Sequence, residues 1–383
     1  MNLLEKSVQL HRDLSGKIEV KSKYEIKTKE DLALIYTPGV AQSCLLIHDN
    51  PEEAYALTAK KNTVAVISDG TAVLGLGDIG PLAAIPVMEG KCALFKKFGD
   101  VNAFPIVLDT KDTEELIKTI TYLAPSFGGI NLEDISAPRC FEVERRLREK
   151  LDIPVFHDDQ HGTAIACGAA LLNALRFVKK SIADVRIVLN GAGSAGIAIS
   201  KFLIELGAKN LVVCDKAGIL DPETQALNSY QIHLAKETNP FGLKGTLKDA
   251  LQGADVFVGV SVGNIVTKEM AASMNKDAIM FPMANPTPEI ARDIALEAGV
   301  LIYGAGISNI PNQINNALVF PGLFKGLLEA RVKQVTTEME IAACHALSNI
   351  IPVEELRADY IIPDIFNLSV AKNISQAIVN LKG

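Results

Sequence analysis

Short apolar runs alternate with longer amphipathic stretches along most of this chain, which is the pattern of an α/β protein. Residues 1 to about 60 look helical, with a turn at 36–39. After them, buried strands are predicted at 62–68, 104–108, 127–132 and 153–156. Helices are predicted between these strands at 78–98, 113–123 and 138–150. Residues 1–160 are therefore expected to form one α/β domain.

A second alternation begins at Val185 and runs through the rest of the chain. Its sheet is expected to have six strands, five of which are assigned to 185–189, 210–214, 255–258, 278–281 and 300–303. Helices are predicted at 194–206, 246–251 and 267–274, and further helices fill the C-terminal part. Short loops between such elements are typical of a doubly wound, Rossmann-type sheet. Residues 161–383 are expected to form this second domain together with the C-terminal helices.

Composition and charge narrow the range of partners. The chain has 383 residues, of which 48% are hydrophobic and 22% are charged, as in ordinary globular proteins. A formal net charge of −7 argues against nucleic acid or an anionic membrane as the main partner. The most apolar run, 164–175, is too short to span a bilayer and is predicted to be a helix buried between the domains.

The N-terminus and the cysteines bear on the cellular compartment. The first residues do not form a basic end followed by an apolar block, as a signal peptide would. The six cysteines are scattered, without a Cys-x-x-Cys pair. That spacing indicates reduced thiols, not a disulfide framework or a zinc site. We therefore expect a cytoplasmic protein.

A glycine-rich turn lies between the first strand and the first helix of the second domain. Its sequence, Asn190-Gly191-Ala192-Gly193-Ser194-Ala195-Gly196, matches G-x-G-x-x-G. In this motif Gly191 permits a tight turn, Gly193 lets a pyrophosphate approach the backbone, and Gly196 lets the helix pack on the strand. Asp215, at the end of the next strand, would bind the ribose hydroxyls of NAD and disfavour the 2′-phosphate of NADP. Lys216 beside it keeps NADP possible.

Two acidic pairs follow predicted strands of the first domain. Glu133-Asp134 comes after 127–132, and Asp158-Asp159 comes after 153–156. Ligands bind at this end of the strands in open α/β sheets. Carboxylates that converge there repel one another unless a cation neutralises them, and such hard oxygen ligands suit Mg²⁺ or Mn²⁺. Acids in these places also commonly cap the helices that follow, so both interpretations are open at this point.

Four further polar residues stand where they could take part in chemistry. Lys91 has apolar neighbours, and a buried lysine with a lowered pKa could act as a base, although the local sequence also fits a surface lysine. Tyr36 lies on a Pro-Gly turn and could donate a proton, or pack with a satisfied hydroxyl group. The side-chain amides of Asn285 and Asn315 suit a carboxylate or a carboxamide, but turns also favour asparagine.

Two other features are left outside the site. The loop 74–78, Leu-Gly-Leu-Gly-Asp, looks suited to a phosphate but equally to a turn in which Asp78 caps a helix. His157 and His161 flank the second acidic pair and could be metal ligands, but a histidine before Gly162 is typical of a turn.

These motifs together resemble the malic enzymes of the short bacterial type. The resemblance is carried, in chain order, by Tyr36-Thr-Pro-Gly-Val, Ile67-Ser-Asp-Gly-Thr with Leu74-Gly-Leu-Gly-Asp-Ile-Gly, Glu89-Gly-Lys91, Glu133-Asp134, Phe156-His-Asp-Asp159-Gln-His-Gly-Thr, Gly191-Ala-Gly-Ser-Ala-Gly, Ala284-Asn285-Pro-Thr and Asn315-Asn316. The motifs stand in the family's order and cover essentially the whole chain.

The resemblance implies a role for each candidate residue. Tyr36 would be the general acid and Lys91 the general base, with Asp158 as a further catalytic carboxylate beside the metal. The ligands of Mn²⁺ or Mg²⁺ would be Glu133, Asp134 and Asp159. Asn285 and Asn315 would contact substrate or nicotinamide. The nucleotide would lie on the glycine-rich turn, with Asp215 at the ribose and with contacts to Gly191, Ala192, Gly193, Ser194, Ala195 and Gly196.

The family pattern is not complete in one place. Long-chain members carry an arginine in the strip Asp-Gly-x-x-x-Leu-Gly, where it grips a substrate carboxylate. Here that strip runs from Asp69 to Gly75 without an arginine. The residue that anchors this carboxylate is therefore left unassigned.

The implied activity is that of an NAD(P)-dependent, oxaloacetate-decarboxylating malate dehydrogenase, which converts (S)-malate to pyruvate and CO₂ with a divalent metal. Decarboxylation of oxaloacetate itself is a further activity that the resemblance allows. A malolactic enzyme, which shares the motifs but keeps NAD bound and releases lactate, is the alternative. A regulatory protein with a decayed site is disfavoured because Tyr36, Lys91 and the acids are all present, and an amino-acid dehydrogenase would not need the acids. A homodimer or larger homo-oligomer is expected.

Overall fold

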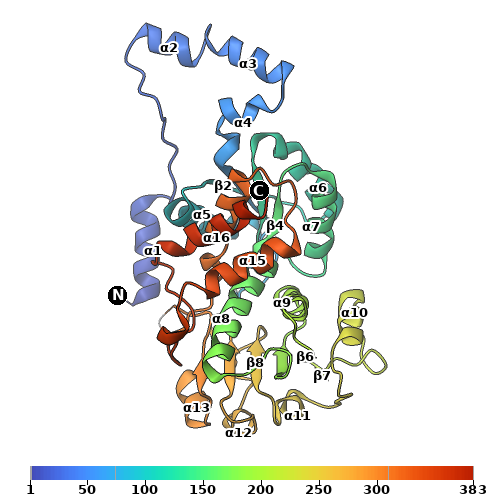
Figure 1. Cartoon of the computed structure of the whole chain (residues 1–383). Helices are drawn as coiled ribbons and strands as arrows, with labels where there is room; N and C mark the ends of the chain where they lie inside the picture. The colour runs from blue at the N-terminus through green and yellow to red at the C-terminus, as the bar shows by residue number, and fades with distance from the viewer. Residues whose placement is uncertain (1, 74, 309, 383) are drawn as a thin grey trace.

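The computed structural model describes residues 2–73, 75–308 and 310–382, and contains two sheets surrounded by helices (Figure 1). The first sheet has four strands in the order β2-β1-β3-β4, and the second has six in the order β10-β9-β8-β5-β6-β7. The predicted fold class, an α/β domain followed by a doubly wound Rossmann-type domain, is confirmed. Leu74, in the loop that looked suited to a phosphate, lies outside the described residues.

The first sheet is parallel and is covered on both faces. Its strands are β1 (Thr63–Ser68), β2 (Asn102–Val107), β3 (Gly129–Leu132) and β4 (Val155–His157). Every residue of β1 is buried, as expected for a parallel strand rich in β-branched side chains. Val64 and Val66 belong to the apolar core on the side of α5 (Pro81–Gly99). Ala65 and Ile67 pack on the opposite side, against α6 (Thr113–Leu123) and α7 (Arg139–Lys150).

The second sheet carries the same alternation between its two faces. Its strands are β5 (Arg186–Asn190), β6 (Asn210–Asp215), β7 (Gly218–Ile219), β8 (Val256–Gly259), β9 (Ile279–Pro282) and β10 (Ile302–Tyr303). Ile187 and Leu189 face one apolar core and Val188 faces the other, so helices cover both sides. β7 is antiparallel to β6 and brings the sheet to six strands, although the sequence predicts no strand at its position. Two residues are too few to give a periodic signal.

Six helices belong to the second half up to β10. They are α8 (Thr163–Val178), α9 (Ser194–Glu205), α10 (Ser229–Glu237), α11 (Leu247–Leu251), α12 (Lys268–Ala272) and α13 (Arg292–Glu297). Together with the turn before it, α8 is long and apolar enough to cross a membrane, by length and composition alone. However, 67% of its most apolar 18-residue stretch is buried inside the protein, as predicted for a helix between the two sheets.

The C-terminal helices return to the first domain. They are α14 (Phe320–Glu329), α15 (Thr337–Ser348) and α16 (Ser369–Asn380). The rings of Phe320 and Phe324 lie 4.6 and 5.3 Å from that of Phe95 on α5. Their place in the chain, after the second sheet, predicts that these helices belong to the second domain. In space they complete the core beside α5 (Figure 1).

Part of the N-terminal region forms an arch that extends away from both sheets (Figure 1). α2 (Lys29–Ile35) and α3 (Val40–Asp49) make up the arch, whereas α1 (Leu3–Leu14) lies beside the body and α4 (Glu53–Leu57) leads back into it (Figure 1). The expected helical character is present, although residues 16–28 form no helix. Between residues 2 and 62, all described, not one residue is buried.

Candidate active site

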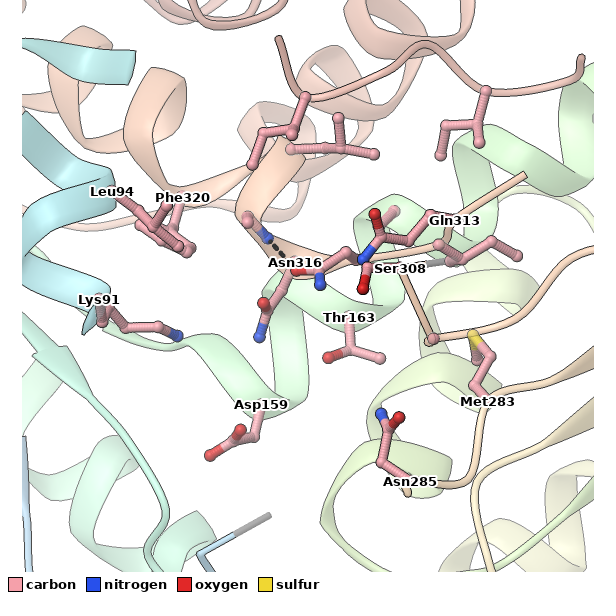
Figure 2. A pocket seen from close by; sticks show the side chains of 18 of the residues that line it. Lys91, Leu94, Asp159, Thr163, Met283, Asn285, Ser308, Gln313, Asn316 and Phe320 are labelled. Atoms are coloured by element: carbon pink, nitrogen blue, oxygen red, sulfur yellow. Dashed lines mark hydrogen bonds between the residues drawn. The ribbon is translucent and has the colours of Figure 1, made fainter. Parts of the chain in front are cut away.

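A cleft of about 1230 Å³ opens where the carboxyl ends of both sheets meet, the usual place for ligands in α/β proteins. Side chains from both domains and from the segment before α14 point into this space (Figure 2). The predicted site residues in its lining are Lys91, Glu133, Asp134, Asp159, Ala195, Asn285 and Asn315. The structure therefore brings together residues that the sequence singled out in distant parts of the chain.

Three carboxylates converge at the ends of β3 and β4. One ligand oxygen from each of Glu133, Asp134 and Asp159 lies within 4.8 Å of the other two. The Asp134 N–H donates to Asp159 Oδ2 at 2.7 Å, which ties the two strand ends together. The alternative interpretation, that these acids cap helices, is wrong, because α7 and α8 begin after Pro138 and Gly162 without a side-chain cap.

The chemistry of this carboxylate set fits a hard divalent cation. Oxygen ligands of one Mg²⁺ or Mn²⁺ ion stand about 2.1 Å from it and so roughly 3–4 Å from one another, close to the spacing found here. Burial raises the pKa of Glu133 to about 7, although Lys91 acts in the opposite direction. Burial likewise raises the pKa of Asp158 to about 6. Such buried carboxylates ionise more easily once a cation compensates their charge.

Lys91 is buried beside these acids and is not a surface lysine. It lies on α5, and its Nζ donates to Glu133 Oε1 and to Asp158 Oδ2, with the Phe320 ring centroid at 4.6 Å. Burial alone would lower its pKa, but the charges of Asp158 and Glu133 outweigh burial and raise the pKa above its ordinary value. The prediction of a lowered pKa is therefore wrong for this arrangement. The local sequence could not show that two carboxylates contact this amine.

Tyr36 is absent from the described lining of the cleft. It is the residue that follows α2 on the N-terminal arch, and it is 66% exposed. Within one copy of the chain, the structure does not bring Tyr36 together with Lys91. The packed-core interpretation of this tyrosine is also wrong, because its side chain is open to solvent.

The glycine-rich turn has the geometry that a dinucleotide requires. Gly191 has φ of 109°, a conformation that favours glycine. A Cβ on Gly193 would have no atom within 4 Å, so its backbone is open to a ligand. A Cβ on Gly196 would lie 1.7 Å from the Gly191 carbonyl oxygen, so only glycine lets α9 approach β5 so closely. No side chain caps α9, and its first N–H groups can face a phosphate.

Asp215 stands at the end of β6, as predicted. The side chain of Gln231, on α10, donates from Nε2 to Asp215 Oδ2 at 3.0 Å and to the Ala192 carbonyl oxygen at 3.2 Å. Gln231 thus fixes the acid relative to the glycine-rich turn. Nothing in the local sequence of Gln231 links it to Asp215, so this contact could not be predicted.

The asparagines lie on the other side of the cleft. Asn285 follows β9, and Asn315 uses its Oδ1 to accept the N–H of Ala317 at 2.8 Å. Asn316, which was not assigned a role, also lines the cleft. The strip of residues 69–75 lacks the arginine that would bind a substrate carboxylate. Arg139 does not take its place, because it pairs with Asp69 and lies outside the described lining of the cleft.

His161, which the sequence predicts to be part of a turn, is a structural residue that pairs with two acids. Its Nε2 and Nδ1 each lie 3.0 Å from a carboxylate, on Glu144 of α7 and Glu340 of α15. Burial lowers its pKa, but the two acids outweigh burial and raise the pKa to about 10. This charged pairing joins α7 and α15 through the turn that carries Asp158 and Asp159.

Replacing His161 by glutamine is expected to destabilise the fold by about 3–5 kcal/mol near pH 6, the usual cost of breaking a buried ion pair. Because the folded pKa lies above the ordinary 6.5, this stabilisation is complete below about pH 6.5 and is lost as pH rises toward 10. Urea unfolding of both proteins at pH 6 and pH 9.5 measures the difference, which should shrink at the higher pH. His233→Gln, in an exposed pair with Glu237, is the control and should change little. A difference independent of pH would show that the ring contributes by packing alone.

Two protein-family models match this chain. The malic enzyme N-terminal domain matches residues 15–148, and the malic enzyme NAD binding domain matches residues 160–295 and 299–381. The chain is 52% identical over 379 residues to the NAD-dependent malic enzyme of Geobacillus stearothermophilus, which covers 99% of this chain and 79% of the relative. It is 50% identical over 379 residues to the bifunctional malic/malolactic enzyme of Bacillus subtilis (strain 168). That match covers 99% of this chain and 92% of the relative.

A solved structure shows the same architecture. The crystal structure of the NAD-dependent malic enzyme from Thermotoga maritima superposes with a TM-score of 0.94 at 48% sequence identity. The superposition covers 97% of this chain and 98% of that one. The similarity therefore includes both domains and the C-terminal helices.

Proposed function

This chain belongs to the malic enzyme family, and from that premise we propose that it oxidises and decarboxylates (S)-malate to pyruvate and CO₂ with a divalent metal and a preference for NAD. The observation that carries the proposal is the place of Lys91. Its Nζ lies between Glu133 and Asp158, in a cleft that also contains Asp159 and extends to the glycine-rich turn.

The reaction needs a base at the C2 hydroxyl group, and Lys91 supplies it. When bound, the nicotinamide supplies the hydride acceptor, and a divalent cation on Glu133, Asp134 and Asp159 supplies an electrophile for the C2 oxygen. Lys91 must first lose its own proton. Asp158 contacts Nζ and has a pKa raised to about 6 by burial, so it can take that proton and return it. The negative charges of Asp158 and Glu133 hold Lys91 protonated. A cation that compensates these charges lowers the pKa of Lys91.

A second proton transfer follows the loss of CO₂. The enolate of pyruvate gains a proton at C3, and the family resemblance gives this role to Tyr36. Tyr36 lies outside the described cleft lining of its own chain, so a single chain in this conformation does not place the Tyr36 hydroxyl group at C3.

The test of the proposed function is a malate assay with NAD or NADP, with and without Mn²⁺, in which both products are measured. Equal amounts of pyruvate and reduced cofactor are expected. The similarity to a bifunctional malic/malolactic enzyme makes lactate the second product to measure. Lactate without free NADH would replace the proposal by the malolactic activity, and no malate turnover with either cofactor would overturn both.

NAD is expected to be used more efficiently than NADP, because the carboxylate of Asp215 at the end of β6 repels a 2′-phosphate. Asp215→Asn should narrow this preference by lowering kcat/KM for NAD and raising it for NADP. Glu223→Gln, an exposed acid after the same strand, is the control and should leave the ratio unchanged. A wild-type kcat/KM that is higher with NADP would mean that Lys216 or a neighbouring loop outweighs Asp215.

A further inference from the structure

Glu289 is a fully buried acid in the second domain, and the reaction described above gives it no role. It lies between β9 and α13, a few residues after Asn285. Its backbone is fixed against the loop after β8. The N–H of Asn264 donates to the Pro288 carbonyl oxygen at 3.0 Å, and the N–H of Val266 donates to that of Glu289 at 3.0 Å. Because a buried carboxylate is costly without hydrogen bonds, the partners of this side chain are informative.

The two oxygens of Glu289 accept hydrogen bonds from two different loops. Oε1 accepts the N–H of Ser261 at 2.9 Å and the hydroxyl group of the same residue at 3.2 Å. Oε2 accepts the N–H of Ala284 at 3.1 Å. Burial raises the pKa of Glu289, whereas the N–H groups of Ser261 and Ala284 act in the opposite direction. Since β8 and β9 are neighbours in the sheet, one side chain joins the loops that follow adjacent strands.

The same contacts continue to the glycine-rich turn. Asn190, the last residue of β5, donates from Nδ2 to Ser261 Oγ at 2.7 Å, and the Ser261 hydroxyl group donates to Glu289. Gly259, the last residue of β8, leaves the space that the acid occupies, because a Cβ there would lie 2.4 Å from Glu289 Cδ. The carboxylate therefore connects the ends of three strands of the second sheet.

These strand ends form one half of the expected cofactor site. β5 is central in the sheet, with β6 on one side and β8 and β9 on the other. A dinucleotide binds across the carboxyl ends of such a sheet, with one nucleotide on each half. Asp215, after β6, is placed for the adenosine ribose, so the nicotinamide half falls to the loops after β8 and β9. Ser261, Ala284 and Asn285 line the cleft there, and Figure 2 shows Asn285 at the edge of this space.

We propose that Glu289 is a positioning residue for the nicotinamide ring, because its carboxylate sets the separation of the loops that carry Ser261 and Asn285. This inference rests on the proposed function. Glu289 is not part of the described cleft lining, so it acts through these loops and not by touching the cofactor. Hydride transfer needs the reacting carbons roughly 3–3.5 Å apart, and a misplacement of about 1 Å can cost roughly 10²-fold in rate.

Glu289→Gln tests the role of the carboxylate. The variant keeps the size of the side chain but replaces one oxygen by an N–H donor, so a buried backbone N–H of Ser261 or Ala284 loses its acceptor. The affinity for NADH should fall roughly 10-fold, as expected for one unsatisfied buried donor. ADP, which has the adenosine half but no nicotinamide, should bind as it does to the wild type. Calorimetric titration with NADH and with ADP measures both affinities without malate turnover.

Two further variants complete the experiment. Glu297→Gln removes an exposed acid of α13 in the same domain and should bind both ligands normally. Ser261→Ala removes only the hydroxyl link between Asn190 and Glu289, and it tests the proposal even if Glu289→Gln does not fold. It should weaken NADH binding about 2- to 10-fold and leave ADP binding unchanged.

The comparison of the two ligands separates positioning from a general structural role. Equal losses of NADH and ADP binding would show that Glu289 only supports the domain, and unchanged NADH affinity in the folded variants would show that the loops do not depend on it. Either result overturns the proposal. A selective loss of NADH binding in a protein whose wild type does not turn over malate would support this inference and refute only the proposed function.

Discussion

Replacing Lys91 by alanine is expected to lower the rate of malate oxidation by ~10²- to 10⁴-fold, the usual contribution of a positioned general base. The side chain is buried, and its Nζ donates to Glu133 and Asp158 at the edge of the proposed metal site. KM for NAD should change little, because the glycine-rich turn belongs to the other sheet. Steady-state kinetics at saturating malate and metal measure both quantities, and urea unfolding checks that the variant is folded.

The matched control for this variant is Lys97→Ala, an exposed lysine on the same helix, which should retain the wild-type rate. Small primary amines are expected to restore part of the activity of Lys91→Ala, because the vacated space is lined by two carboxylates that attract an ammonium group. If Lys91→Ala turns over malate at the wild-type rate, Lys91 only neutralises the acids, and the base is another residue.

The parts of the site that could be predicted are those that depend on local sequence. Gly191 and Gly196 each have a steric reason that follows from a strand, a turn and a helix in succession, and the structure shows both reasons, while the space beside Gly193 is open to a ligand. The two acidic pairs could be placed because parallel strands end at one edge of a sheet, so residues after β3 and β4 must be neighbours.

The parts that could not be predicted depend on contacts between distant segments. The raised pKa of Lys91 comes from acids that are 42 and 67 positions away in the chain. His161 acquires its charge from Glu144 and also from Glu340, which lies on a helix that no periodic pattern assigns to the first domain. Tyr36 is exposed and lies outside the described lining of the cleft because the whole arch extends away from the sheets. Its helices look ordinary in sequence, and only the structure shows that their apolar side chains have no cover.

Removing divalent metal with EDTA is expected to abolish malate turnover, and adding Mn²⁺ or Mg²⁺ should restore it. Glu133, Asp134 and Asp159 offer three carboxylates within 4.8 Å, and such acids bind a hard cation in competition with protons. Burial raises the pKa of Glu133 to about 7. The affinity for Mn²⁺ should therefore fall as the pH drops below about 7. Calorimetric titration of Mn²⁺ at pH 6 and pH 8 measures this independently of activity.

A substitution of Asp159 distinguishes two hypotheses: that the acids bind a metal ion, and that they only balance the charge of Lys91. The lysine hydrogen-bonds to Glu133 and Asp158, whereas Asp159 accepts the N–H of Asp134. Asp159→Asn should weaken Mn²⁺ binding by more than the roughly 10- to 100-fold typical of residues that only support a ligand. Asp215→Asn, on the second sheet, is the matched control and should bind Mn²⁺ normally. Full activity in metal-free buffer, or unchanged Mn²⁺ binding by Asp159→Asn, would mean that the acids serve only to hold Lys91 in its charged form.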